Sequence, residues 1–281
     1  MTTWDAIIVG AVQGATEFLP VSSSGHLVIT RYFYGVPDLS LSYTIMLHAG
    51  TLLAVVAALW RDIYDAARLV LRGQRDGLNL TIAVVVATIP GAAAGYVFSG
   101  MLDQIFVEKG VLWHGFQIEP FKFVGAAMIL TAQVFLHRAN EYLQQHDEPA
   151  ATQPWHAAVT LPRALWIGLA QAAAVVPGIS RSGATIATGI LCGVSRDTAA
   201  RFSFIMSIPI ILGALAHDII KHRVELAYEA SADLQMKLLG VAVAAITGFL
   251  AVRCMLRLLR THNLRAFIVY LWILGLFCIA S

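Results

Sequence analysis

The sequence predicts an all-α integral membrane protein with two inverted-topology repeats, each holding one re-entrant helical hairpin and three transmembrane helices. Of its 281 residues, 58% are hydrophobic and only 13% are charged, whereas charged residues make up ~25% of a soluble domain. A soluble fold of this size cannot bury so much apolar surface, so the excess must face lipid. Two Pro/Gly/Ser turns at matching places in the chain indicate the internal repeat.

Six apolar runs predict full spans, because each is long enough, or nearly so, to cross the ~30 Å of hydrocarbon as a helix. We therefore expect about ten helices, six of them full spans, in a single membrane domain covering residues 1–281. The runs lie at about 42–60, 79–98, 121–136, 202–216, 235–252 and 266–280.

Two shorter apolar segments, Trp4–Phe18 and Arg163–Val176, run into polar turns. The turns read LPVSSSG over 19–25 and PGISRSG over 177–183. Pro and Gly end a helix, and the hydroxyl groups can pair backbone groups that lipid would leave without partners. We expect each unit to be a re-entrant hairpin. Two full spans joined by a surface loop remain the alternative.

The two turns belong to an internal repeat. A shift of 158 positions superimposes the serines and glycines of one turn on those of the other, and it also places Gln13 over Gln171. The sequence therefore predicts repeat one at about 4–136 and repeat two at about 163–280, joined by a polar cytoplasmic linker at 137–160. The matched turn residues are Ser22 with Ser180, Ser24 with Ser182, and Gly25 with Gly183.

Charge placement predicts the orientation. Segments 61–78 and 253–265 carry four arginines each, so the positive-inside rule places both in the cytoplasm. Segments 99–120 and 217–234 hold more acids than bases and fit the outer side. Three spans and one hairpin per repeat invert the second repeat, so the two polar tips can meet inside the protein. The acids that define the outer side include Asp103, Glu108, Glu119, Glu225, Glu229 and Asp233.

Ionisable residues within apolar segments are functional candidates, and Glu17 is the first of these. It lies one helical turn after Gln13, so both side chains share a face. A structural ion pair between Glu17 and Arg181 is the alternative, and an interhelical hydrogen bond is the alternative for Gln13. His48 has no histidine counterpart in the second repeat, and we expect it to be structural.

The turn Ser22–Gly25 precedes His26. Its hydroxyl groups, free backbone N–H groups and the positive end of the next helix form a natural phosphate cradle. His26 lies three residues after Ser23, so a hydroxyl–imidazole contact of the kind that activates a serine nucleophile is geometrically reasonable. The alternative is that the serines only cap the helix and that His26 anchors the turn.

Arg181 lies in the counterpart turn, aligned with Ser23. Its guanidinium fork matches phosphate or carboxylate oxygens. Together with the acid, the imidazole and the hydroxyl groups, it indicates metal-assisted phosphoryl transfer. In this interpretation Glu17 and Gln13 hold a divalent cation. The phosphate-binding candidates are Ser22, Ser24, Gly25, Ser180, Arg181, Ser182 and Gly183.

The motif Gln13-x-x-x-Glu17 followed by FLPVSSSGH over 18–26, together with PGISRSG over 177–183, resembles the undecaprenyl-diphosphatase, or bacitracin-resistance, family. The resemblance implies hydrolysis of a C55 polyprenyl diphosphate with Mg²⁺ or Ca²⁺ at the outer (periplasmic) face of the bacterial inner membrane. That reaction regenerates the lipid carrier used for peptidoglycan synthesis.

The family's acidic motif is Glu or Gln, three residues, then Glu, and this chain has Gln13 at the first position. The resemblance assigns the family's serine, histidine and arginine to Ser23, His26 and Arg181. We favour Ser23 as the nucleophile with His26 as its base, while attack by His26 or by water stays open.

Other functions fit parts of the pattern. A flippase for the monophosphate lipid would explain inverted repeats with broken helices, whereas an intramembrane serine protease would need a distant Ser–His pair that is not evident. The net charge of +2 gives no reason to expect a nucleic-acid partner. The expected partners are the polyprenyl lipid and membrane lipids, and a homodimer is compatible with the sequence.

The orientation is testable by cysteine labelling in intact cells. We expect Arg72→Cys and Arg257→Cys to be protected from a membrane-impermeant thiol reagent until lysis, because eight arginines lie in the two segments that hold them. Strong labelling of either position before lysis would reverse the predicted topology.

Overall fold

The computed structural model describes residues 2–35, 39–103, 111–113, 116–146, 154–224, 226, 233–261 and 263–281. It is helical almost throughout, and the predicted all-α membrane class is confirmed. Five helices are long and apolar enough to cross a membrane, and a sixth, of 16 residues, is apolar but shorter. They are α3 (Leu41–Ala58), α5 (Arg75–Asp103), the continuous helix α6 (Pro120–Leu130), η2 (Thr131–His137) and α7 (Arg138–Gln145), α10 (Arg196–Lys221), α12 (Leu234–Thr261), and the shorter α13 (Arg265–Ala280).

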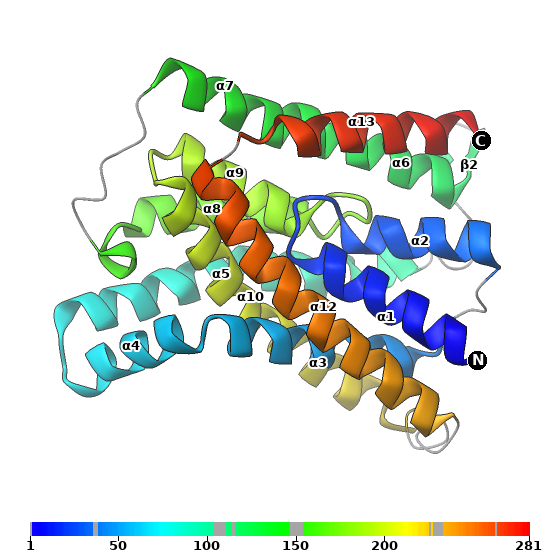
Figure 1. The fold of residues 1–281 in the computed structure, drawn as a ribbon, viewed down its shortest axis with the longest axis horizontal. Helices are drawn as coiled ribbons and strands as arrows, with labels where there is room; N and C mark the ends of the chain where they lie inside the picture. Colours follow the sequence, from blue (N-terminus) through cyan, green and yellow to red (C-terminus); the bar gives the residue numbers. More distant parts are fainter. Residues whose placement is uncertain are drawn as a thin grey trace.

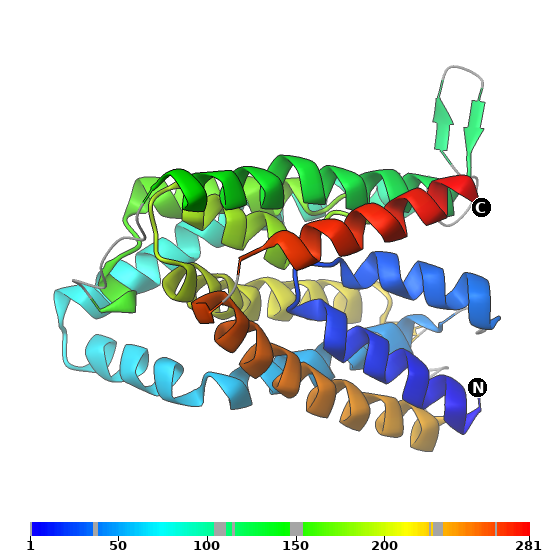
Figure 2. The same cartoon turned by 45° about the horizontal axis from the view of Figure 1, so that its top comes forward.

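The remaining elements lie at the ends of these helices. Helix α4 (Trp60–Leu71) follows α3 after a break at Leu59, and the short 3₁₀ helix η3 (Trp155–Ala157) precedes the second repeat. Strands β1 (Val111–Trp113) and β2 (Phe116–Ile118) pair antiparallel and project from the end of the bundle where the chain ends lie (Figure 2).

Some predictions fall on parts of the chain that the structure does not describe. The predicted linker 137–160 begins as helix and remains helical to Gln145, while its residues 147–153 lie outside the described residues. The outer-side acids Glu108, Glu225 and Glu229 also lie outside them.

Each repeat contains the helix–turn–helix unit that the sequence predicts. The first unit is α1 (Thr3–Glu17) and α2 (Ser23–Tyr34), and the second is α8 (Leu161–Ala173) and α9 (Arg181–Leu191). The units enter from opposite ends of the bundle and their turns approach each other in its middle (Figure 1). At 15 and 13 residues, α1 and α8 are too short to span the hydrocarbon, which supports the re-entrant interpretation.

The packing of the hairpins is reciprocal between the predicted repeats. Helix α1 packs mainly against α12 of the second half, and α8 packs mainly against α5 of the first. At the centre of each contact the two helix backbones lie so close together that only glycine fits between them. A methyl group at Gly10 would run into the backbone of Gly240, and one at Gly168 would lie 2.6 Å from the carbonyl oxygen of Ala87. This exchange of partners supports the division into two repeats.

Charged residues join several helices at the end opposite the chain termini. Arg201 of α10 pairs with Asp62 of α4 and with Asp197, and Asp197 also accepts from Arg260 of α12 at 2.8 Å. The N- and C-terminal ends lie together at the other end (Figure 1). The arginine-rich segments therefore share one side, as the predicted topology requires.

The close helix contacts predict a specific pattern of stability. Gly168→Ala should destabilise the protein by about 1–3 kcal/mol, the usual cost of overpacking, because its methyl group meets backbone that cannot move aside. Gly95→Ala is the matched control, since nothing lies within 4 Å of its added methyl group. It should be neutral or stabilising by up to about 1 kcal/mol through helix propensity. Thermal unfolding of the purified variants measures both, and equal Tm values would contradict the close approach.

Candidate active site

The two hairpin turns contact each other directly. The backbone N–H of Gly178 donates to Ser24 Oγ at 3.3 Å, and Ser182 Oγ donates to the carbonyl of Leu19 at 2.7 Å. Each turn thus supplies one serine that satisfies a backbone group of the other turn. The expectation that the polar tips meet inside the protein agrees with this geometry.

Equivalent serines cap the second helix of each hairpin. Ser22 Oγ accepts the N–H of Gly25 at 3.3 Å, and Ser180 Oγ accepts that of Gly183 at 3.1 Å. Ser180 is only 1% exposed, and its own N–H donates to the Thr131 hydroxyl at the start of η2.

Most of the predicted phosphate cradle is therefore engaged within the protein. Ser182 is buried as well, and its hydroxyl donates to the carbonyl of Leu19. Ser23 is half-buried and Ser24 is exposed. Among the serines of the two turns, these two are the ones whose position allows contact with a ligand.

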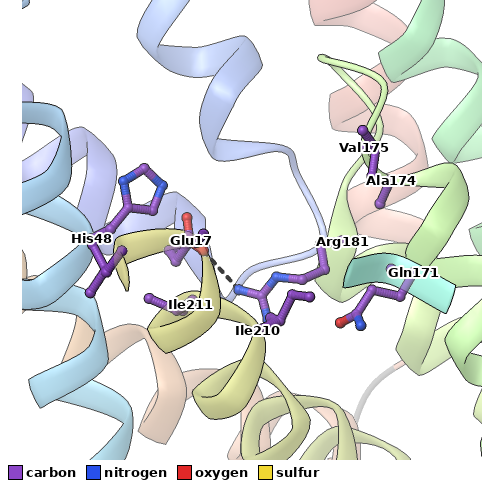
Figure 3. A pocket seen from close by; sticks show the side chains of 11 residues that line it. Glu17, His48, Gln171, Ala174, Val175, Arg181, Ile210 and Ile211 are labelled. Carbon is purple, nitrogen blue, oxygen red and sulfur yellow. Dashed lines mark hydrogen bonds and ion pairs between the residues drawn. The ribbon is translucent and has the colours of Figure 1, made fainter. Parts of the chain in front are cut away.

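Glu17 joins the two halves of the molecule. Its Oε1 accepts from Arg181 Nη2 at 2.7 Å, while its Oε2 accepts from Ser23 Oγ at 2.7 Å and from Gln13 Nε2 at 3.0 Å. The side chains of Glu17 and Arg181 are 7% and 16% exposed, so the ion pair is shielded from water (Figure 3). Charge-assisted bonds of this kind are stronger than neutral ones.

Three buried polar atoms at this place have no hydrogen-bond partner among the described residues. They are Gln13 Oε1, Gln171 Oε1 and Arg181 Nη1. Leaving a buried group unpaired costs about 1–3 kcal/mol, and more when the group is charged. Such atoms mark a site that water or a ligand completes, and Arg181 Nη1 is a donor suited to an anionic oxygen.

Gln171 and Arg181 line a cavity of about 240 Å³, and Glu17 and His48 complete its polar wall (Figure 3). Its remaining lining is apolar or glycine and comes from α5, α10 and the second turn. His48 Nδ1 donates to the carbonyl of Thr44 at 2.9 Å, which fixes its ring beside Glu17.

Sequence reasoning did not place His48 or Gln171 in the site. The repeat contained the signal for Gln171, because Gln171 is the counterpart of Gln13. In both glutamines Oε1 is buried and has no hydrogen-bond partner within the part of the chain that the structure describes. His48 has no such counterpart, and only its position within an apolar run made it a candidate.

His26 lies in a different environment from the one expected. Its Nδ1 donates to the carbonyl of Ser22 at 2.8 Å, so in the neutral imidazole Nε2 accepts from the hydroxyl of Tyr270 at 2.6 Å. The two rings stack with centroids 5.7 Å apart. Ser23 donates to Glu17 instead, and the expected Ser23–His26 contact is not formed.

The backbone of the first turn explains this placement. Ser22 has φ of 69°, a conformation that non-glycine residues rarely adopt. Its carbonyl accepts both the backbone N–H and the ring Nδ1–H of His26. The turn thereby directs the imidazole toward Tyr270 of α13, a partner that the local sequence does not reveal.

The residues present fit a divalent cation whose coordination shell would be completed by phosphate oxygens. No group of three His, Cys, Asp or Glu side chains capable of holding a metal occurs within the described part of the chain. Mg²⁺, however, is commonly held by one or two protein oxygens together with phosphate oxygens and water. Glu17 offers a carboxylate, and Gln13 Oε1 offers a buried oxygen that has no hydrogen-bond partner among the described residues.

Comparison with known proteins agrees with this architecture. The family model of the bacitracin resistance protein BacA matches residues 6–277. A protein of Moorella thermoacetica named undecaprenyl-diphosphatase is 37% identical, and the alignment covers 100% of this chain and 98% of that protein. Proteins of the same name from Caldicellulosiruptor bescii and Thermomicrobium roseum are 35% and 36% identical, each over 98% of this chain and 96% of the relative. The chain therefore belongs to the bacitracin resistance protein BacA family.

Proposed function

We propose that this protein is an undecaprenyl-diphosphatase of the bacterial inner membrane. It hydrolyses undecaprenyl diphosphate to undecaprenyl phosphate and inorganic phosphate, which recycles the lipid carrier for cell-wall polymers and confers bacitracin resistance. The observation that carries the proposal is the contact of Ser23, Glu17 and Arg181 where the hairpin tips meet. Beside it lies Arg181 Nη1, a donor with no partner in the described ranges of the chain. The site opens to the periplasmic side in the predicted orientation.

Arg181 binds the diphosphate. Its Nη1 is buried and finds no partner among the residues that the structure describes, and its planar fork can engage two phosphate oxygens at once. The second hairpin holds the guanidinium in place, because Arg181 is the first residue of α9, directly after Ser180, which caps the helix. A pre-positioned cation of this kind stabilises the charge that develops on the transferred phosphoryl group.

Ser23 is the proposed nucleophile and Glu17 its proton acceptor. The Oγ–Oε2 distance of 2.7 Å is within the range for proton transfer. Serine Oγ bonds to the terminal phosphorus, the bond from that phosphorus to the bridging oxygen breaks, and polyprenyl monophosphate leaves. Water then attacks the phosphoserine, which releases inorganic phosphate and restores the hydroxyl group.

His26 takes a supporting role in this scheme. Both ring nitrogens have partners, Ser22 and Tyr270, so the imidazole ties the first turn to α13. It thereby holds Ser23, three residues earlier, in position. This assignment replaces His26 with Glu17 as the base for Ser23.

A divalent cation, Mg²⁺ or Ca²⁺, completes the proposed site. Glu17 and Gln13 are the residues that would hold it, for the reasons of donor chemistry given above. When bound, such a cation neutralises phosphate charge. A glutamine ligand is weaker than a carboxylate, so Gln13→Glu should retain activity.

The decisive measurement is phosphate release from undecaprenyl diphosphate by the purified protein. Glu17→Gln should lower the rate by about 10²–10⁴-fold, because it removes the proton acceptor of Ser23. Arg181→Lys should also lose most activity, since one ammonium cannot bind two oxygens as a fork does.

Two controls accompany this test. Glu119→Gln alters an exposed acid far from the cavity in sequence and should leave the rate unchanged. Because removing one partner of a buried ion pair can cost several kcal/mol, each variant's Tm must be compared with that of the unmodified protein. A folded, fully active Glu17→Gln variant would contradict the proposed role.

The nucleophile makes a separate prediction. Ser23→Ala should abolish activity, and rapid acid quenching of the unmodified protein should trap an acid-stable phosphoserine. His26→Ala should keep measurable activity, because the structure gives Ser23 a different hydrogen-bond acceptor. An acid-labile phosphoenzyme that survives Ser23→Ala would identify His26 as the attacking group instead.

A further inference from the structure

A second hollow extends the polar cavity toward the surface of the molecule. It has a volume of about 500 Å³, lies mainly between α5 and α10, and is lined largely by small and apolar residues. The two spaces share wall residues, so they are continuous. The shared residues are Gly91, Val175, Ile210 and Ala214.

Glycines keep this groove open. At Gly95 of α5 and Gly213 of α10, an added methyl group would meet no atom within 4 Å. Elsewhere in the molecule glycines serve close helix packing, as at Gly10. Ala92 and Gly213 are exposed, so the groove reaches the outer surface of the helix bundle, where lipid lies in a membrane protein.

The groove and the cavity together match an amphiphile. One end offers Arg181, with a buried donor that has no partner among the described residues. The other offers an apolar channel with no charged residue until its far end, where His217 and Asp218 lie 3.3 Å apart. A soluble diphosphate would fill only the polar cavity and leave the apolar channel empty. A ligand with an anionic head and an apolar tail would fill both, because the channel gives the tail surroundings that exclude water.

We propose that the α5–α10 groove holds the first isoprene units of a polyprenyl chain whose phosphate head lies at Arg181. This inference rests on the proposed function, and it specifies how the lipid enters. The chain slides between α5 and α10 from the bilayer, so the diphosphate reaches Glu17 and Arg181 without the whole molecule leaving the membrane. Because the chain exchanges one apolar environment for another, van der Waals packing against the groove wall stabilises the complex, not removal of apolar surface from water.

Bulk added inside the groove tests this placement. Gly95→Leu and Gly213→Leu each add a side chain that enters open space and also favours the helix. We expect the KM for undecaprenyl diphosphate to rise about tenfold, because the added side chain occupies the space of the isoprene units and removes on the order of ten of their packing contacts with the wall. The kcat should stay within about twofold, because neither residue contacts the reacting groups.

Matched controls lie on the same helices. Ala93 and Ala216 are exposed and do not line the groove, so Ala93→Leu and Ala216→Leu add the same kind of bulk toward lipid. Both should leave KM unchanged. If all four variants behave alike, or if the groove variants leave KM unchanged, the assignment of the groove is overturned.

A binding measurement separates the groove from the catalytic proposal. Polyprenyl monophosphate carrying a diazirine on its first isoprene units should crosslink to peptides of α5 and α10, and Gly213→Leu should abolish the crosslink. Crosslinking without phosphate release by the unmodified protein would retain the groove and refute the diphosphatase. Crosslinks to other helices, or displacement of the probe by excess phosphatidylglycerol as efficient as by unlabelled polyprenyl phosphate, would refute the groove.

Discussion

The ion pair between Glu17 and Arg181 is the interaction on which the rest of the molecule depends. A lone buried charge in a membrane protein is costly, so neither residue is tolerable without the other. Because they come from different hairpins, the pair forms only when both re-entrant turns reach the middle of the bundle. The close packing of α1 on α12 and of α8 on α5 brings the turns to that depth. The fold and the site are therefore consequences of one constraint.

The low polarity of the surroundings also explains how the turn serines divide their roles. Helix ends within a membrane must satisfy their backbone groups internally. Ser22 and Ser180 do this as caps, and Ser24 and Ser182 do it across the two turns. Ser23 is the serine whose hydroxyl instead contacts the acid. The hydroxyl that we propose as the nucleophile is thus one that takes part in neither the helix caps nor the contacts between the turns.

The fold could be derived from the sequence to a large extent, while the site could be derived only in outline. Apolar length and arginine placement are properties of whole segments, so they predict the spans and the meeting of the tips. Side-chain direction is a local property that depends on the backbone. The positive φ of Ser22 turns His26 toward Tyr270, and no pattern in the sequence predicts that backbone angle. His48 and the α5–α10 groove arise from tertiary packing, which places residues of distant segments together.

The exchange of partners between the two halves has a consequence for how such a site can originate. A pair of identical half-length chains with this packing would form a symmetric dimer, in which both tips carry the same residue at each position. Such a dimer would hold every contact between the tips twice, so a glutamate–arginine pair would occur in two symmetry-related copies. In the present chain the position matching Arg181 is Ser23, and the position matching Glu17 is Val175. Fusion into one polypeptide lets the halves diverge, so a two-fold scaffold can support a single, chemically polarised centre.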